Sequence, residues 1–220
     1  NNDSMDIELS HANIFSSERF TGLDRVESGI RVNFGLKSSI DLNNYGAIDA
    51  LIGRVWRPDT PQKDFTKGTG LDEKFSNVVG NIKYNISNTL KFDYSFSKDS
   101  LDLRSQRDTF SLDLNMDPFF SNLNYTMVRD DPNPSSNVPS NSEQALVSIN
   151  WNISDNWSTH LTQSRDFVGT NHGDAIFSKA SIQYLNECIK INISAERNHR
   201  DMIDVPDATT FSITFELVGF

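Results

Sequence analysis

Polar and apolar residues alternate along most of this chain, and the alternation is strictest in the last third. Two runs there place apolar side chains on one face and polar side chains on the other: Ile189, Ile191, Ile193 and Ala195 alternate with Lys190, Asn192 and Ser194, and Phe211, Ile213, Phe215 and Leu217 alternate with Ser212, Thr214 and Glu216. A period of two is the period of a β-strand. These runs therefore predict strands that have one apolar and one polar face.

The same alternation recurs along the chain and predicts about eleven strands. We expect them near residues 29–42, 45–57, 77–87, 89–98, 105–117, 120–130, 142–153, 156–166, 174–185, 188–198 and 208–218. No amphipathic helix longer than two turns is predicted. The expected fold class is therefore all-β, with residues 1–28 as a loop that leads into the strands.

The connections between these strands alternate between short and long. Short turns are expected at 43–44, 87–88, near 118, at 154–156 and at 186–187, and long loops before 29 and at 57–76, 98–104, 130–141, 167–173 and 198–208. In an antiparallel up-and-down sheet, this order places all short turns at one end and all long loops at the other. Outer-membrane barrels are built in this way, and a tilted strand of about 9–11 residues spans the membrane.

We therefore predict an antiparallel up-and-down transmembrane β-barrel segment that is part of a larger barrel. The polar face is mostly small and uncharged, as in a wet lumen, and aromatic residues such as Trp56, Trp151 and Trp157 lie near strand ends, which suits the interface girdles of a barrel. Two alternatives stay open. One is a soluble β-sandwich that binds carbohydrate, although the outer face of a sandwich is usually richer in Lys and Glu. The other is a porin-like outer-membrane channel.

Composition narrows the function classes. The 220 residues carry a net charge of −10, and nothing resembles the basic patch of a nucleic-acid-binding protein. No apolar run is long enough for a transmembrane helix. The four histidines have no metal-ligand spacing and no nucleophile motif is present, so we expect no catalytic residue, metal or cofactor. The chain starts at Asn1-Asn2 without a signal peptide, and we interpret it as a mature piece or a C-terminal fragment.

Three stretches carry a family resemblance: residues 13–29, residues 184–197 and residues 211–219. The first is the most specific, and its aromatic, glycine and Asp-Arg pattern is carried by Phe15, Phe20, Gly22, Leu23, Asp24, Arg25 and Gly29. The three stretches resemble the C-terminal part of the lipopolysaccharide-assembly outer-membrane family LptD, also called OstA or Imp. A single cysteine in the second stretch, where other members carry an adjacent pair, is similar to the alphaproteobacterial branch.

This resemblance implies a barrel of about 26 strands, of which residues 29–218 would form roughly the last eleven. The signal peptide, a periplasmic domain and the earlier strands would lie in the missing part. The family is a translocon and not an enzyme. It takes lipopolysaccharide from a periplasmic bridge protein, is plugged by an LptE-like lipoprotein, and releases the lipid into the outer leaflet through a seam between its first and last strands. These molecules and the outer membrane would be the partners, with no nucleic acid.

The resemblance also implies candidate seam residues. The C-terminal side of the seam would be formed by Thr209, Phe211, Ile213, Phe215 and Leu217. Pro206 precedes this strand and has no N–H to donate to a neighbouring strand. We hypothesise that Pro206 keeps the upper end of the seam short, and the alternative is an ordinary loop proline.

Cys188 is the single cysteine and cannot form a disulfide within the chain. In the family, a cysteine at this site pairs with the periplasmic domain, which implies an interdomain disulfide here. The order of the turns agrees with this, because Cys188 lies in a short turn and short turns of outer-membrane barrels face the oxidising periplasm. Counting strands from this turn also places the C-terminus in the periplasm. A free structural thiol is the alternative.

Overall fold

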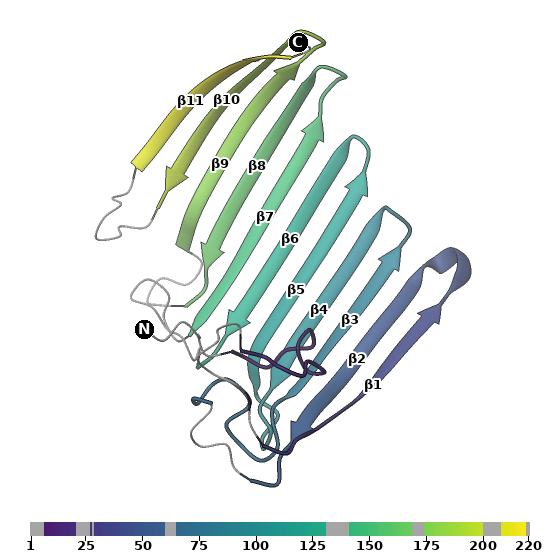
Figure 1. The fold of residues 1–220 in the computed structure, drawn as a ribbon. Helices are drawn as coiled ribbons and strands as arrows, with labels where there is room; N and C mark the ends of the chain where they lie inside the picture. The colour runs from purple at the N-terminus through teal and green to yellow at the C-terminus, as the bar shows by residue number, and fades with distance from the viewer. Residues whose placement is uncertain are drawn as a thin grey trace. The chain divides into compact units, whose positions relative to one another are not determined.

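The computed structural model describes residues 7–20, 27, 29–59, 65–130, 141–168, 174–199 and 208–218. Eleven strands occupy most of them (Figure 1): β1 (Val32–Asp41), β2 (Ala47–Trp56), β3 (Val78–Ile86), β4 (Leu90–Lys98), β5 (Ser105–Met116), β6 (Phe119–Val128), β7 (Ser142–Asn152), β8 (Trp157–Asp166), β9 (Asp174–Leu185), β10 (Ile189–Asn198) and β11 (Ala208–Leu217). The one helical piece of the described residues is the short turn η1 (Asn43–Tyr45). The predicted strands are confirmed, and their ends differ by a few residues at most.

All eleven strands belong to one sheet, and their order in the sheet is their order in the sequence. Every strand pair with a defined register is antiparallel. The predicted antiparallel up-and-down sheet is therefore confirmed. A β-sandwich needs two packed sheets, whereas the described residues form one, so the β-sandwich alternative is wrong. No helix in the described part of the chain is long and apolar enough to cross a membrane.

The lengths of the connections sort as predicted. The short turns lie at 42–46, 87–89, 117–118, 153–156 and 186–188, and the longer connections at 57–77, 99–104, 129–141, 167–173 and 199–207. Consecutive strands alternate in direction (Figure 1), so the short turns belong to one end of the strands and the longer connections to the other. Aromatic pairs lie near the short turns of β5–β10: the ring centroids of Trp157 and Tyr184 are 5.0 Å apart, and those of Phe119 and Trp151 are 5.5 Å apart.

Contacts divide the chain into two units. Unit 1 comprises Asn1–Ser87, Phe92–Phe110 and Thr126–Ser142, and unit 2 comprises Asn88–Lys91, Ser111–Tyr125 and Glu143–Phe220. The two units are described separately below.

Strands β1–β3 of unit 1 carry an apolar face that is open to the surroundings. Cross-strand partners share a face, and Leu36 lies opposite Ile52 while Ile40 lies opposite Ile48. Leu36 is 69% exposed and Ile52 is 46% exposed. Covering apolar surface gains about 25 cal/mol per Å², so such a face favours contact with lipid over contact with water. We call it the exposed apolar face, and we call the other side of the sheet the polar face.

Unit 2 repeats this arrangement across β7–β11. On the exposed apolar face, one row of cross-strand partners runs through Trp157, Tyr184, Ile191 and Phe215. On the polar face, one row runs through Asn152, Ser158, Gln183, Asn192 and Thr214. The two faces differ in chemistry because the side-chain period of two is kept in register from each strand to the next.

Candidate functional site

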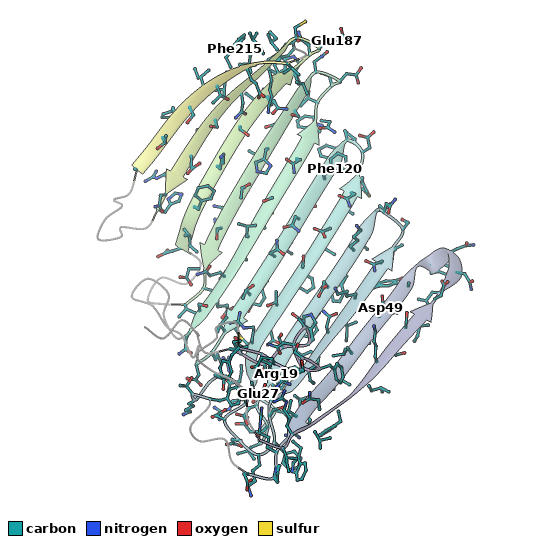
Figure 2. The ribbon with its side chains drawn as sticks, viewed as in Figure 1. Arg19, Glu27, Asp49, Phe120, Glu187 and Phe215 are labelled. Carbon is teal, nitrogen blue, oxygen red and sulfur yellow. The ribbon has the colours of Figure 1, made fainter. Side chains whose placement is uncertain are left out.

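The largest buried core of the described residues lies at the long-loop end of unit 1. It is formed by Leu9, Ile14, Phe20, Val55, Phe65, Leu71 and Val79. Three of these come from residues 7–20, which we call the lead-in segment, and two come from the loop between β2 and β3. The two valines lie on the polar face of β2 and β3. The lead-in segment and the loop therefore form a dry patch on a face that is otherwise polar, and Figure 2 shows Arg19 and Glu27 among these loops.

A pair of glycines makes room for the lead-in segment on the polar face. Gly35 of β1 and Gly53 of β2 are cross-strand partners. A Cβ atom on Gly53 would lie 2.6 Å from Ile14 Cδ1, and one on Gly35 would lie 3.1 Å from the Phe15 ring. Both distances are shorter than an ordinary contact between carbon atoms. The two glycines thus allow the lead-in segment to lie directly against the sheet.

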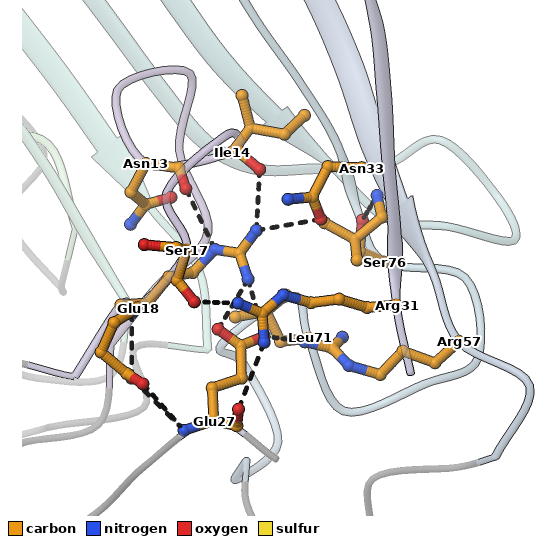
Figure 3. A network of polar contacts seen from close by, with 12 residues as sticks. Asn13, Ile14, Ser17, Glu18, Glu27, Arg31, Asn33, Arg57, Leu71 and Ser76 are labelled. Carbon is orange, nitrogen blue, oxygen red and sulfur yellow. Dashed lines mark hydrogen bonds and ion pairs between the residues drawn. The ribbon is translucent and has the colours of Figure 1, made fainter. Parts of the chain in front are cut away.

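Three arginines surround one glutamate beside this core (Figure 3). Arg19 Nη1 donates to both carboxylate oxygens of Glu27, at 2.6 and 2.8 Å. Arg57 Nη2 donates to Glu27 Oε1, and Arg31 Nη1 lies 3.5 Å from the same oxygen. The side chains of Arg19 and Glu27 are completely buried. One carboxylate therefore joins the lead-in segment, the residue before β1 and the residue after β2.

The guanidinium groups find further partners within the core. Arg19 also donates to two backbone carbonyls of the lead-in segment, at 2.8 and 3.0 Å, and the Arg57 guanidinium lies 4.9 Å from the centroid of the Phe65 ring. Burial lowers the pKa of Arg19 and of Arg57, and the Glu27 carboxylate opposes that shift. Because arginine stays protonated in proteins, the cluster holds more positive than negative charge away from water. Its stability therefore depends on Glu27.

Strand β11 carries the predicted seam residues. It stands last in the strand order, pairs with β10 alone, and all of its residues are exposed. One side of the strand carries Thr209, Phe211, Ile213, Phe215 and Leu217, which are two residues apart and so share a face. Phe211 is 79% exposed and Leu217 is 60% exposed. In the described part of the chain, no strand pairs with the other edge of β11.

Cys188 lies in the short turn between β9 and β10, as predicted. Its backbone N–H donates to Asn186 Oδ1 at 2.9 Å, and its backbone carbonyl accepts from the N–H of Val218 at 2.8 Å. Its thiol is exposed and forms no disulfide within the described residues. The turn therefore presents an accessible sulfur atom next to the end of β11.

A comparison with protein families identifies the family. The model of LptD, described as LPS transport system D, matches residues 1–157. This chain belongs to the LptD family. The resemblance seen in the sequence is thus confirmed, and it makes the chain a relative of a transport component. The match supports a role in lipopolysaccharide transport and a place in the outer membrane.

Solved structures show more distant similarities. Two triple mutants of Rh. blastica porin are similar at 11% identity, with TM-scores of 0.42 and 0.43, and a double mutant is similar at 10% identity, with a TM-score of 0.43. Each similarity covers 85% of this chain and 80% of the porin chain. No curated protein matches the chain. The LptD match, and not the porins, identifies the chain.

The LptD match includes the motif residues but ends before Cys188 and β11. Within the motif, Phe20 lies in the loop core, Phe15 lies over Gly35, and Gly29 has a φ of 91°, a backbone conformation that favours glycine. The remaining predicted site residues lie outside the described residues: Gly22, Leu23, Asp24, Arg25 and Pro206.

The alternation of polar and apolar residues gives no sign of the arginine–glutamate cluster. Arg19 and Glu27 lie inside the motif stretch 13–29, but Arg57 is 30 residues from Glu27. Charged residues in loops are usually solvated, so their local pattern does not distinguish a buried group from an exposed one. The one feature of the sequence that could have pointed to the cluster is the number of charged residues in the stretch 13–29, which also carries the aromatic residues of the motif.

Proposed function

We propose that this chain is part of an outer-membrane translocon that assembles lipopolysaccharide into the outer leaflet through a lateral seam of a barrel. The LptD match carries this proposal. The sheet supports it, because one face suits contact with lipid and the other suits contact with water and sugar. The short turns, and with them the C-terminus, would face the periplasm, and the long loops would face the outside, as in other outer-membrane barrels.

The polar face of unit 2 supports a path for the saccharide part of the substrate. Its row from Asn152 to Thr214 is uncharged, and no described residue hydrogen-bonds to the side chains of that row. A pocket of about 450 Å³, lined in part by Asn152, Ser158 and Gln183, opens where the row crosses β7–β9, beside the short turn at residues 153–156. Each net hydrogen bond to such groups is worth only about 1 kcal/mol. Amide and hydroxyl groups can therefore bind sugar hydroxyls in turn without trapping them.

The free edge of β11 supports the seam. Inside a bilayer, each unpaired backbone N–H or C=O costs several kcal/mol, so this edge must pair with another strand, which in a larger barrel would be the first one. A seam that opens must be weakly paired. Pro206 would shorten the pairing at the loop end because it has no N–H, and an unchanged lipopolysaccharide output after Pro206→Ala would count against this role.

Photo-crosslinking in cells tests the seam. With a photoreactive residue in place of Phe211 or Phe215 in the full-length protein, we expect adducts with lipopolysaccharide at both positions. Ile149 is the matched control, because it lies in the same cross-strand row as Phe211 but on β7, away from the edge. Equal adducts at all three positions would contradict a seam at β11 and would favour a porin-like barrel that merely contacts the lipid around it.

We also propose that Cys188 forms a disulfide with a periplasmic domain of the full-length protein. Its exposed thiol and its place in a short turn support this. On a gel without reductant, the full-length protein is expected to migrate differently from its reduced form, and Cys188→Ser is expected to abolish that difference. Cys188 that reacts with a maleimide before any reduction would contradict the proposal.

The family resemblance implies two protein partners for this role. One is an LptE-like lipoprotein that plugs the barrel, and the other is a periplasmic bridge protein that delivers lipopolysaccharide. The amide and hydroxyl groups of the polar face suit a plug that is held by hydrogen bonds. Full-length protein that is isolated from membranes without a stoichiometric lipoprotein would contradict the first of these partners.

A further inference from the structure

We propose that Arg54 and Lys74 form a binding site for the phosphate groups of lipopolysaccharide on the outside of the barrel. Arg54 lies near the loop end of β2, opposite Phe34, and so belongs to the exposed apolar face. A pocket of about 360 Å³ opens there, lined by Arg54, Glu73, Lys74, Phe75, Ser100 and Leu101. No residue of β11 and no residue of the loop core lines this pocket.

Arg54 carries a buried donor that lacks an acceptor. Its Nη2 donates to the backbone carbonyl of Ser76 at 3.0 Å, and its guanidinium lies 4.7 Å from the centroid of the Phe75 ring. Its Nε is buried and has no hydrogen-bond partner in the described part of the chain. A buried donor without a partner is costly, and a phosphate oxygen is an acceptor that matches the fork of a guanidinium group. Arg54 therefore lines the pocket with a guanidinium group whose hydrogen-bonding capacity the described residues do not fill.

A second cation lines the same pocket. Lys74 is exposed and has no ion-pair partner among the described residues. The Glu73 carboxylate also lines the pocket, but it accepts a hydrogen bond from Ser100 Oγ at 3.0 Å. The pocket lining thus holds two cations and one carboxylate, so the lining itself carries a net positive charge.

The surroundings of these cations are apolar. Leu101 is 80% exposed, Phe75 is 48% exposed and Phe34 is 45% exposed. Cationic groups at the border of an apolar face suit an amphiphile whose phosphate lies above its acyl chains. The inference rests on the proposed function, because that function places the long loops at the outer leaflet and makes lipopolysaccharide the phosphate-bearing lipid beside them.

Native mass spectrometry of the full-length protein in detergent tests this site. The protein is incubated with bisphosphorylated lipid A, with lipid A from which the phosphates have been removed, or with phosphatidylglycerol. We expect the wild type to retain the bisphosphorylated lipid A best, and Arg54→Met and Lys74→Met each to lower its retention about tenfold, the effect of losing one charge-assisted hydrogen bond. Lys37→Met is the matched control, because Lys37 is an exposed lysine on the polar face of β1, and it is expected to bind like the wild type.

The outcomes separate this site from the proposed function. Equal retention of phosphorylated and dephosphorylated lipid A, or an equal loss in Lys37→Met, would overturn the site. Equal retention of phosphatidylglycerol would overturn lipopolysaccharide as its occupant. Lys74→Met guards against misfolding, because this exposed side chain bonds to no described residue. If no crosslinks formed at β11 but the wild type still retained bisphosphorylated lipid A best, the seam would be refuted and the Arg54 site would stand.

Discussion

Glu27→Gln is expected to open the loop core without unfolding the strands. The substitution keeps the shape of the side chain but removes the buried carboxylate charge that pairs with Arg19, Arg57 and Arg31. Breaking a buried ion pair by removing one partner costs about 3–5 kcal/mol, which corresponds to a loss of about two to four orders of magnitude in protection. Hydrogen exchange of the full-length protein measures this, in peptides that cover residues 7–20 and 65–77.

Glu196→Gln is the matched control for this prediction. Glu196 pairs with Lys179 at 3.4 Å, and the two side chains are 45% and 37% exposed. An exposed pair of this kind contributes at most about 1 kcal/mol. We therefore expect little change in exchange for Glu196→Gln, and none in the peptides of β10 for Glu27→Gln. Similar effects of the two substitutions would show that burial of the cluster does not stabilise the loops.

A lysine on the exposed apolar face is expected to prevent stable insertion into a bilayer. Ile193 lies midway along β10, with Ile182 and Ile213 as its cross-strand partners. On the lipid face of an outer-membrane barrel, a lysine near the midplane costs about 2–4 kcal/mol. In water, the same change at a side chain that is 47% exposed would cost no more than about 0.5 kcal/mol. Urea unfolding of the full-length protein in lipid vesicles measures the difference for Ile193→Lys.

The neighbouring position provides the control for the two faces. Ser194 lies next to Ile193 and points to the polar face, where its cross-strand partners are Ser181 and Ser212. Ser194→Lys is expected to leave the unfolding free energy nearly unchanged, because a wet lumen solvates the charge. If Ile193→Lys were as well tolerated as Ser194→Lys, the exposed apolar face would not be in contact with lipid.

The strands and their faces could be predicted because the relevant signal is local. Along β10 and β11, each residue's type already shows which face it occupies, since neighbouring side chains point to opposite sides. The register then follows from the short turn at residues 186–188, which leaves little freedom in how the two strands pair. The antiparallel order of the whole sheet follows from such hairpins repeated along the chain.

The loop core could not be predicted in the same way. In the sequence, Gly35 and Gly53 are glycines inside two predicted strands, where a glycine usually weakens the strand. In the structure, they are the place where Ile14 and Phe15 contact the sheet. The orientation of Arg54 follows from strand parity, but the absence of an acceptor for its Nε depends on how the loop at residues 65–77 folds around it. Neither feature has a period that a sequence pattern could reveal.

By itself, the sequence of this protein determined eleven strands, their order, the two faces of the sheet and a membership of the LptD family that its motifs made visible. The tertiary structure alone decided that Glu27 binds Arg19 and Arg57 in a dry cluster, and that the lead-in segment lies on the polar face. The physical reason is the range of the interactions. Strand faces and hairpins depend on residues that are neighbours in the chain. The cluster instead contains an ion pair between Glu27 and Arg57, which are 30 residues apart, and the burial of these side chains is defined only once the chain has folded.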